Sequence, residues 1–109
     1  MDKISFNFKN RTAVITGGAQ GFGLDIAKRF LHSGAKVIIW DIDPKMIDKS
    51  LKDLNNSNLS SNIVDVSNYQ EVESTVNEIT QSSNIDILIN NAGITGPTAT
   101  LWEYDIEMW

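Results

Sequence analysis

A glycine-rich turn lies between an apolar run and a helical pattern near the start of this chain. The run Thr12–Thr16 (TAVIT) leads directly into Gly17, Gly18, Ala19, Gln20, Gly21, Phe22 and Gly23, where the helical pattern begins. Glycine lets the backbone turn tightly and leaves no Cβ in the path of a ligand. The free N–H groups and the dipole at a helix amino terminus favour a bound anion. A strand, a glycine turn and a helix in this order therefore predict a phosphate site.

An acidic residue further along narrows the ligand to a dinucleotide. Asp41 closes the next apolar run, twenty residues after Gly21. A carboxylate at about this separation can accept hydrogen bonds from both ribose hydroxyls of an adenosine. The Gly-Lys-Ser/Thr sequence of a P-loop is absent from the turn. We therefore expect dinucleotide binding, with a purely structural glycine turn as the alternative.

The alternation of apolar runs and helical patterns predicts an α/β fold with a doubly wound parallel sheet. The four expected strands are Thr12–Thr16, Lys36–Asp41, Ser60–Asp65 and Ile85–Asn90. Three full helices are expected between them. The first runs from Gly21 to Ser33, with Phe22 on its buried stripe and Gly34 after its end. The second has Asp43 as N-cap and Pro44 as first residue, and the third starts at Ser67, with Gln70 completing a capping box. We expect the strand order 3-2-1-4, in a single domain over residues 1–109.

Charge and composition exclude several classes of partner. The chain has 109 residues, a formal net charge of -5 and no cysteine, which argues against nucleic-acid or anionic-membrane partners and against thiolate metal sites. All basic residues lie at or before Lys52. No apolar run approaches the roughly 20 residues that span a bilayer, and the amino terminus lacks a signal-peptide pattern. We expect no metal site, a structural role for His32, and a soluble cytoplasmic protein.

Four motifs in order resemble the short-chain dehydrogenase/reductase family. They are Gly-x-x-x-Gly-x-Gly after Thr16, the carboxylate Asp41, the pair Asp65-Val66, and Asn90-Asn91-Ala92-Gly93. The resemblance covers residues 8–109 and implies a partial Rossmann fold. It also implies that Asp65 holds the adenine amino group, that Val66 lines the adenine pocket, and that Asn91, Ala92 and Gly93 border the ribose beside the nicotinamide. The expected cofactor-binding residues are Gly17, Gln20, Gly21, Phe22, Gly23, Asp41, Ile42, Asp65, Val66, Asn91, Ala92 and Gly93, whereas Asn90 is expected to tie neighbouring strands together.

Charge near the second strand favours NAD over NADP. Asp41 would repel the 2′-phosphate of NADP, while its oxygens can accept hydrogen bonds from the free hydroxyls of NAD. Relatives that prefer NADP usually carry a basic residue at the positions that here hold Gln20 and Ile42. We therefore expect NAD as the cofactor, with NADP less favoured.

The resemblance implies hydride transfer between a nicotinamide cofactor and a carbonyl or secondary alcohol, performed by a serine and a Tyr-x-x-x-Lys pair. Tyr69 and Tyr104 are followed four residues later by Glu73 and Met108, and no lysine follows Lys52. We predict no catalytic residue here. We interpret the sequence as a truncated amino-terminal, NAD-binding portion, inactive alone, whose open fourth strand favours self-association.

Two alternatives remain open. One is a non-catalytic dinucleotide-sensing or interaction module that shares the same cofactor fold. A nucleoside-binding methyltransferase is more remote, because the run Asn90-Asn91-Ala92-Gly93 does not fit it. The sequence does not identify the substrate.

Overall fold

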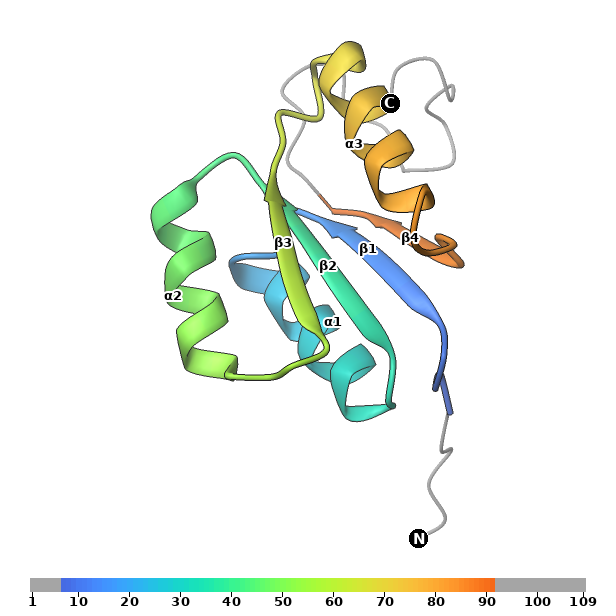
Figure 1. The fold of residues 1–109 in the computed structure, drawn as a ribbon. Helices are drawn as coiled ribbons and strands as arrows, with labels where there is room; N and C mark the ends of the chain where they lie inside the picture. The colour runs from blue at the N-terminus through green and yellow to red at the C-terminus, as the bar shows by residue number, and fades with distance from the viewer. Residues whose placement is uncertain (1–6, 92–109) are drawn as a thin grey trace, which may run out of the picture.

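The computed structural model describes residues 7–91, which form one parallel sheet between helices (Figure 1). In chain order the elements are β1 (Thr12–Thr16), α1 (Gly21–His32), β2 (Lys36–Asp41), α2 (Pro44–Leu54), β3 (Leu59–Ile63), α3 (Tyr69–Thr80) and β4 (Ile87–Asn90). The strand order is β3-β2-β1-β4. The expected α/β class, the three helices and the strand order 3-2-1-4 are therefore confirmed.

Alternating residues of the central strands build a core on each face of the sheet. Ile15 and Ile39 pack with α1 and α2 on one face. Val14 and Trp40 pack on the opposite face with residues of α3. The two central strands, β1 and β2, are largely buried on both sides because helices cover both faces, as in a doubly wound sheet.

The end of the first helix and the start of the second use the residues that the sequence predicts for them. Gly34 adopts φ +91° after α1, and its N–H donates to the Leu31 carbonyl at 3.0 Å, as in a Schellman-type helix end. Asp43 caps α2, since its Oδ1 accepts from the Lys45 N–H at 3.0 Å. The prediction that Phe22 lies on the buried stripe of α1 is wrong, because this side chain is 80% exposed.

The third helix begins one residue later than predicted. Asn68, not Ser67, is its N-cap, and the Asn68 Oδ1 accepts from the Glu71 N–H at 3.2 Å. The Ser67 hydroxyl instead donates to Asp65 Oδ1 at 2.6 Å. The proposed Ser67–Gln70 capping box is therefore wrong, because the Ser67 side chain is already engaged by the loop before the helix.

Two strand boundaries also differ from the prediction. β3 runs over Leu59–Ile63, in register with β2 from Val37 to Asp41, so it ends where the neighbouring strand β2 ends. β4 begins at Ile87, two residues later than expected, and Asp86 just before it contacts β1 through its N–H and its carboxylate.

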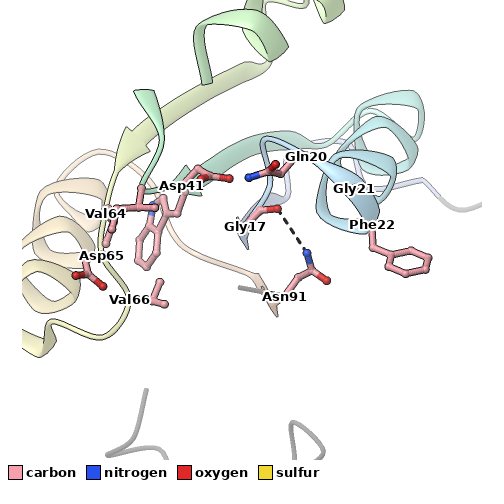
Figure 2. A pocket seen from close by; sticks show the side chains of 11 residues that line it. Gly17, Gln20, Gly21, Phe22, Asp41, Val64, Asp65, Val66 and Asn91 are labelled. Carbon is pink, nitrogen blue, oxygen red and sulfur yellow. Dashed lines mark hydrogen bonds between the residues drawn. The ribbon is translucent and has the colours of Figure 1, made fainter. Parts of the chain in front are cut away.

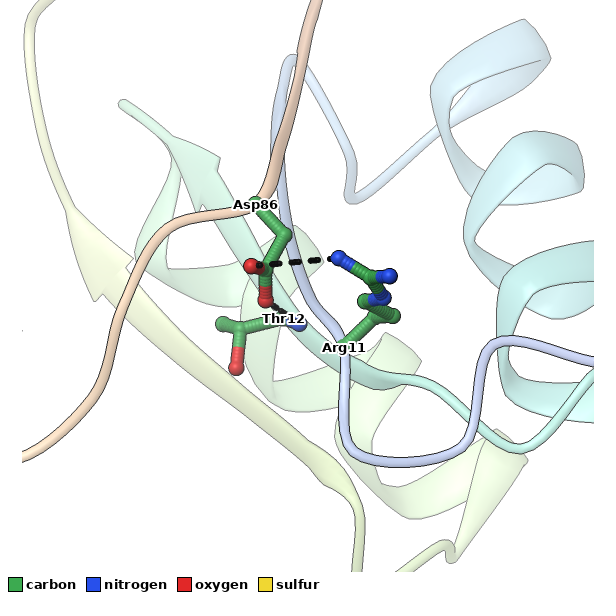
Figure 3. A network of polar contacts seen from close by, with 3 residues as sticks. All are labelled: Arg11, Thr12 and Asp86. Carbon is green, nitrogen blue, oxygen red and sulfur yellow. Dashed lines mark hydrogen bonds and ion pairs between the residues drawn. The ribbon is translucent and has the colours of Figure 1, made fainter.

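That contact fixes β4 beside β1 at the start of both strands (Figure 3). The Asp86 N–H donates to the Thr12 carbonyl at 2.9 Å, and Asp86 Oδ2 accepts from the Thr12 N–H at 2.9 Å. Arg11 lies 3.8 Å from the other carboxylate oxygen and is largely exposed. One aspartate therefore satisfies both backbone groups of the first residue of β1.

Candidate functional site

A cleft of about 490 Å³ lies over the carboxyl-terminal ends of the strands (Figure 2). Its lining residues come from the segments that leave β1, β2, β3 and β4. They are Gly17, Gln20, Gly21, Phe22, Trp40, Asp41, Ile42, Val64, Asp65, Val66 and Asn91. In open parallel sheets this edge is where ligands bind.

The glycine turn forms the part of the cleft above β1. Gly21 has φ +58°, and a Cβ built there would have no protein atom within 4 Å. This space is therefore open to a ligand. At the start of α1, Gln20 is the N-cap, and it makes no side-chain cap hydrogen bond. The first turn of α1 also contains no acidic residue, so no side chain of that turn repels an anion.

Gly23 does not line the cleft, and the structure gives it a different role. A Cβ at this position would overlap the Gly17 carbonyl oxygen and would lie 2.8 Å from Asn91 Nδ2. The first turn of α1 can approach the strand so closely only because this residue has no side chain. Gly23 therefore shapes the site from below its surface.

The Asp41 carboxylate stands at the end of β2 and is only 6% exposed. Its Oδ2 accepts from the Ala19 N–H at 3.3 Å, and its Oδ1 accepts from the Asp43 N–H at 3.2 Å. An ionised carboxylate has about four acceptor positions, so each oxygen retains capacity for another donor. Backbone groups thus hold the carboxylate in place and leave it able to bind hydroxyls.

Asp65 and Val66 line the cleft beyond β3. The Ser67 hydroxyl donates to Asp65 Oδ1 at 2.6 Å and the Ser67 N–H at 2.9 Å. These two hydrogen bonds lower the pKa of the Asp65 carboxyl below its ordinary value, the hydroxyl having the larger effect. Asp65 is therefore a fixed negative charge at neutral pH.

Thr16 joins β1 to the segment that follows β4. Its hydroxyl donates to Asn90 Oδ1 at 3.0 Å, which confirms that Asn90 ties the two strands together. The same oxygen accepts from the Asn91 N–H at 2.8 Å. Asn91 Nδ2 in turn donates to the Gly17 carbonyl at 3.5 Å, the contact drawn in Figure 2. Asn91 is therefore tied to the glycine turn.

The structure brings nine of the twelve expected cofactor-binding residues to one cleft. Of the other three, Gly23 lies beneath the turn, while Ala92 and Gly93 lie outside the described residues. Sequence reasoning missed Trp40 and Val64, which also line the cleft. Their positions beside Asp41 and Asp65 were the only available signal, because apolar residues at strand ends look the same whether they face a core or a ligand.

Within the part of the chain that the structure describes, the lining of the cleft contains two carboxylates and no lysine, arginine or histidine. Among residues 7–91 no cluster of histidine and acidic side chains could hold a metal ion. Over the same residues, no helix combines the length and apolar character needed to cross a bilayer. Tyr69 is 61% exposed, and Glu73 one turn later provides no ammonium group.

Comparison with known proteins identifies relatives over nearly the whole chain. A family model described as short chain dehydrogenase matches residues 11–109. A 3-oxoacyl-[acyl-carrier-protein] reductase of Chlamydia trachomatis is 38% identical over 104 residues, covering 92% of this chain and 42% of that protein. A 2-dehydro-3-deoxy-L-rhamnonate dehydrogenase (NAD(+)) of a Sphingomonas species is 29% identical, covering 98% of this chain and 43% of that protein.

The fold comparison agrees. The L-sorbose reductase of Gluconobacter frateurii, solved with NADPH and L-sorbose, superposes with a TM-score of 0.75 at 30% identity, covering 97% of this chain and 41% of that one. The chain thus spans about two fifths of the length of the relatives it matches.

Proposed function

The chain belongs to the short-chain dehydrogenase family, and from this premise we propose that its cleft binds NAD(H) for hydride transfer to or from a carbonyl or secondary alcohol. One observation carries the proposal. The open, uncapped turn at Gly21 and the fixed carboxylate of Asp41 share a single cleft. A pyrophosphate and a ribose diol are the two neighbouring groups that such a pair would bind.

The remaining lining residues take the other parts of the dinucleotide in this proposal. Asp65 accepts a hydrogen bond from the adenine amino group, and Val66 packs against the ring. Gly17, Gln20, Phe22 and Ile42 shape the turn and the ribose pocket, and Gly23 supports the turn from beneath the cleft. Asn91, with Ala92 and Gly93 after it, borders the ribose next to the nicotinamide. The support is the order of these residues across β3, β2, β1 and β4.

Charge supports NAD over NADP. The 2′-phosphate of NADP would meet Asp41, and none of the described residues that line the cleft carries a cationic side chain to bind it. Relatives of this fold do include an enzyme solved with NADPH, so the family does not decide between the cofactors. A net penalty of about 3 kcal/mol against the 2′-phosphate corresponds to about a hundredfold preference for NAD.

A non-catalytic dinucleotide-sensing module is the second candidate. It would use the same cleft, and it is favoured by one observation: within residues 7–91 the single tyrosine, Tyr69, has Glu73 where the catalytic pair requires lysine. The reading frame after Trp109 separates the two: a continuation that encodes a serine and a Tyr-x-x-x-Lys pair supports the oxidoreductase, and its absence supports the module. NAD reduction by this chain with any of a panel of secondary alcohols would overturn the module, whereas binding without turnover is expected of both candidates.

The cofactor proposal is tested by calorimetric titration of NAD and NADP. We expect the wild type to prefer NAD, and Asp41→Asn to weaken NAD binding and to reduce the preference. Asp53→Asn removes the same charge from the exposed carboxyl end of α2 and should behave as the wild type. A wild type that prefers NADP would overturn the NAD assignment, and one that binds neither would overturn the proposed function.

A further inference from the structure

One residue of the glycine turn, Ala19, is held at both its backbone groups. Its N–H donates to Asp41 Oδ2 at 3.3 Å. Its carbonyl accepts from the Ser50 hydroxyl at 2.8 Å. Ala19 and Ser50 are 1% and 2% exposed, so water does not compete for either hydrogen bond. The turn is therefore fastened to the end of β2 on one side and to α2 on the other.

Ser50 is unusual for the surface on which it lies. Its helix presents apolar side chains to the same core, with Ile47 buried and Leu51 and Leu54 packed against it. A buried hydroxyl among such residues is unfavourable unless it has a partner. The Ala19 carbonyl is that partner, so the polar group of Ser50 is explained by the turn and not by the packing of α2.

The position of Ala19 makes this contact relevant to the cleft. Ala19 directly precedes Gln20, Gly21 and Phe22, which line the cleft, whereas no residue of α2 does. The preceding N–H, that of Gly18, donates to the Trp40 carbonyl at 3.2 Å. The turn is thus fixed to β2 twice and to α2 once. Only the α2 contact lies away from the cleft.

We propose that Ser50 is a positioning residue for the cofactor: it holds Ala19 so that the turn and the Asp41 carboxylate keep their binding arrangement. This inference rests on the proposed function. Without the hydroxyl, the Ala19 carbonyl loses its buried donor, and the backbone at Ala19 can shift toward another hydrogen-bond partner. The carbonyl and the N–H of Ala19 belong to different peptide groups joined at its Cα, so a shift of this residue would also weaken the contact between its N–H and Asp41 Oδ2.

Two measurable effects follow. The apparent affinity for NAD is proportional to the fraction of the protein whose turn is in the binding arrangement. We expect Ser50→Ala to lower that fraction and so to raise the dissociation constant for NAD about five- to tenfold. Because Asp41 sets the preference for NAD, the ratio of the NADP to the NAD dissociation constant should fall as well. A general loss of stability would leave that ratio unchanged.

The experiment titrates NAD and NADP against the wild type, Ser50→Ala and a matched control at a temperature where all are folded by circular dichroism. Ile47→Val is the control, because it trims a buried side chain on the same helix and keeps the hydroxyl. Ser50→Cys retains the size of serine with a weak S–H donor. It should give an intermediate loss, and it carries the test if Ser50→Ala does not fold.

The outcomes separate the inference from the function. A reduced affinity and a reduced ratio in the Ser50 variant, with neither in Ile47→Val, supports the inference. If the wild type binds NAD and the Ser50 variant shows an unchanged ratio, the inference is overturned and the proposed function stands. If the wild type binds neither dinucleotide, the proposed function itself fails.

Discussion

Replacing Gly21 or Gly23 with alanine adds the same methyl group at two positions with opposite surroundings. At Gly23 the new Cβ would overlap the Gly17 carbonyl oxygen and approach Asn91 to 2.8 Å. Overpacking of this kind costs about 1–3 kcal/mol, whereas alanine in a helix is about 1 kcal/mol better than glycine. Because the obstruction includes backbone, we take the upper end of the range and expect Gly23→Ala to lose about 2 kcal/mol of stability.

At Gly21 the new Cβ would meet no protein atom within 4 Å. The substitution then carries only the penalty for φ +58°, about 1–2 kcal/mol for a residue with a side chain. The methyl group would nevertheless occupy the space where we propose that the pyrophosphate lies. Gly21→Ala should therefore fold and fail to bind the cofactor.

Urea unfolding with and without NAD measures both effects. NAD at 100 times the wild-type dissociation constant should stabilise the wild type by about 2.7 kcal/mol. The increment should be close to zero for Gly21→Ala. An equal increment in Gly21→Ala and wild type would refute the phosphate site at the turn. A Gly23→Ala protein as stable as the wild type would refute the steric argument for that glycine.

Two further predictions concern hydrogen bonds outside the turn. In Ser67→Ala the NMR-determined pKa of Asp65 should rise toward its ordinary value but not reach it, because the backbone N–H of residue 67 still donates. Since the native pKa is lowered, the stability contributed by ionised Asp65 is present at neutral pH and is lost as the pH falls through that pKa; an unchanged pKa in the variant would contradict the assigned cause. Asp86→Ala should lose about 1.5–3 kcal/mol in urea unfolding by leaving the Thr12 N–H without its charged acceptor, whereas Arg11→Ala should lose at most about 1 kcal/mol; equal losses would show that the ion pair matters more than the backbone contact.

The sequence predicts the central strands to the residue and the later boundaries less well. β1 and β2 contain the unbroken apolar runs 13–15 and 37–40, which are largely buried, so their limits are visible as changes in composition. β3 is half polar, and its limits follow from its pairing with β2, which a sequence pattern does not contain. The start of α3 differs for a similar reason: Ser67 and Asn68 are both good caps, and the hydroxyl of Ser67 is taken by Asp65.

The site shows the same division. Glycines and acidic residues at the ends of strands can be recognised as binding residues from the sequence, because the backbone freedom of glycine and the charge of an acid seldom serve the packing of the core at these positions. Ser50 gave no such signal. It lies 31 residues from Ala19 in sequence, and only the packing of α2 beside the turn brings the two together.

The order of the strands also fixes the order and the spacing of the chemical groups along the edge of the cleft. At or just after the carboxyl ends of β3, β2, β1 and β4 lie in turn a carboxylate, a second carboxylate, a glycine turn and an amide. Neighbouring strands lie about 4.8 Å apart, so three intervals span about 14 Å. An extended ligand laid along this edge meets the four chemical groups in one fixed sequence. A dinucleotide bound end for end to the site that we propose would place its phosphates against a carboxylate, so the proposed site would accept this ligand in one direction only.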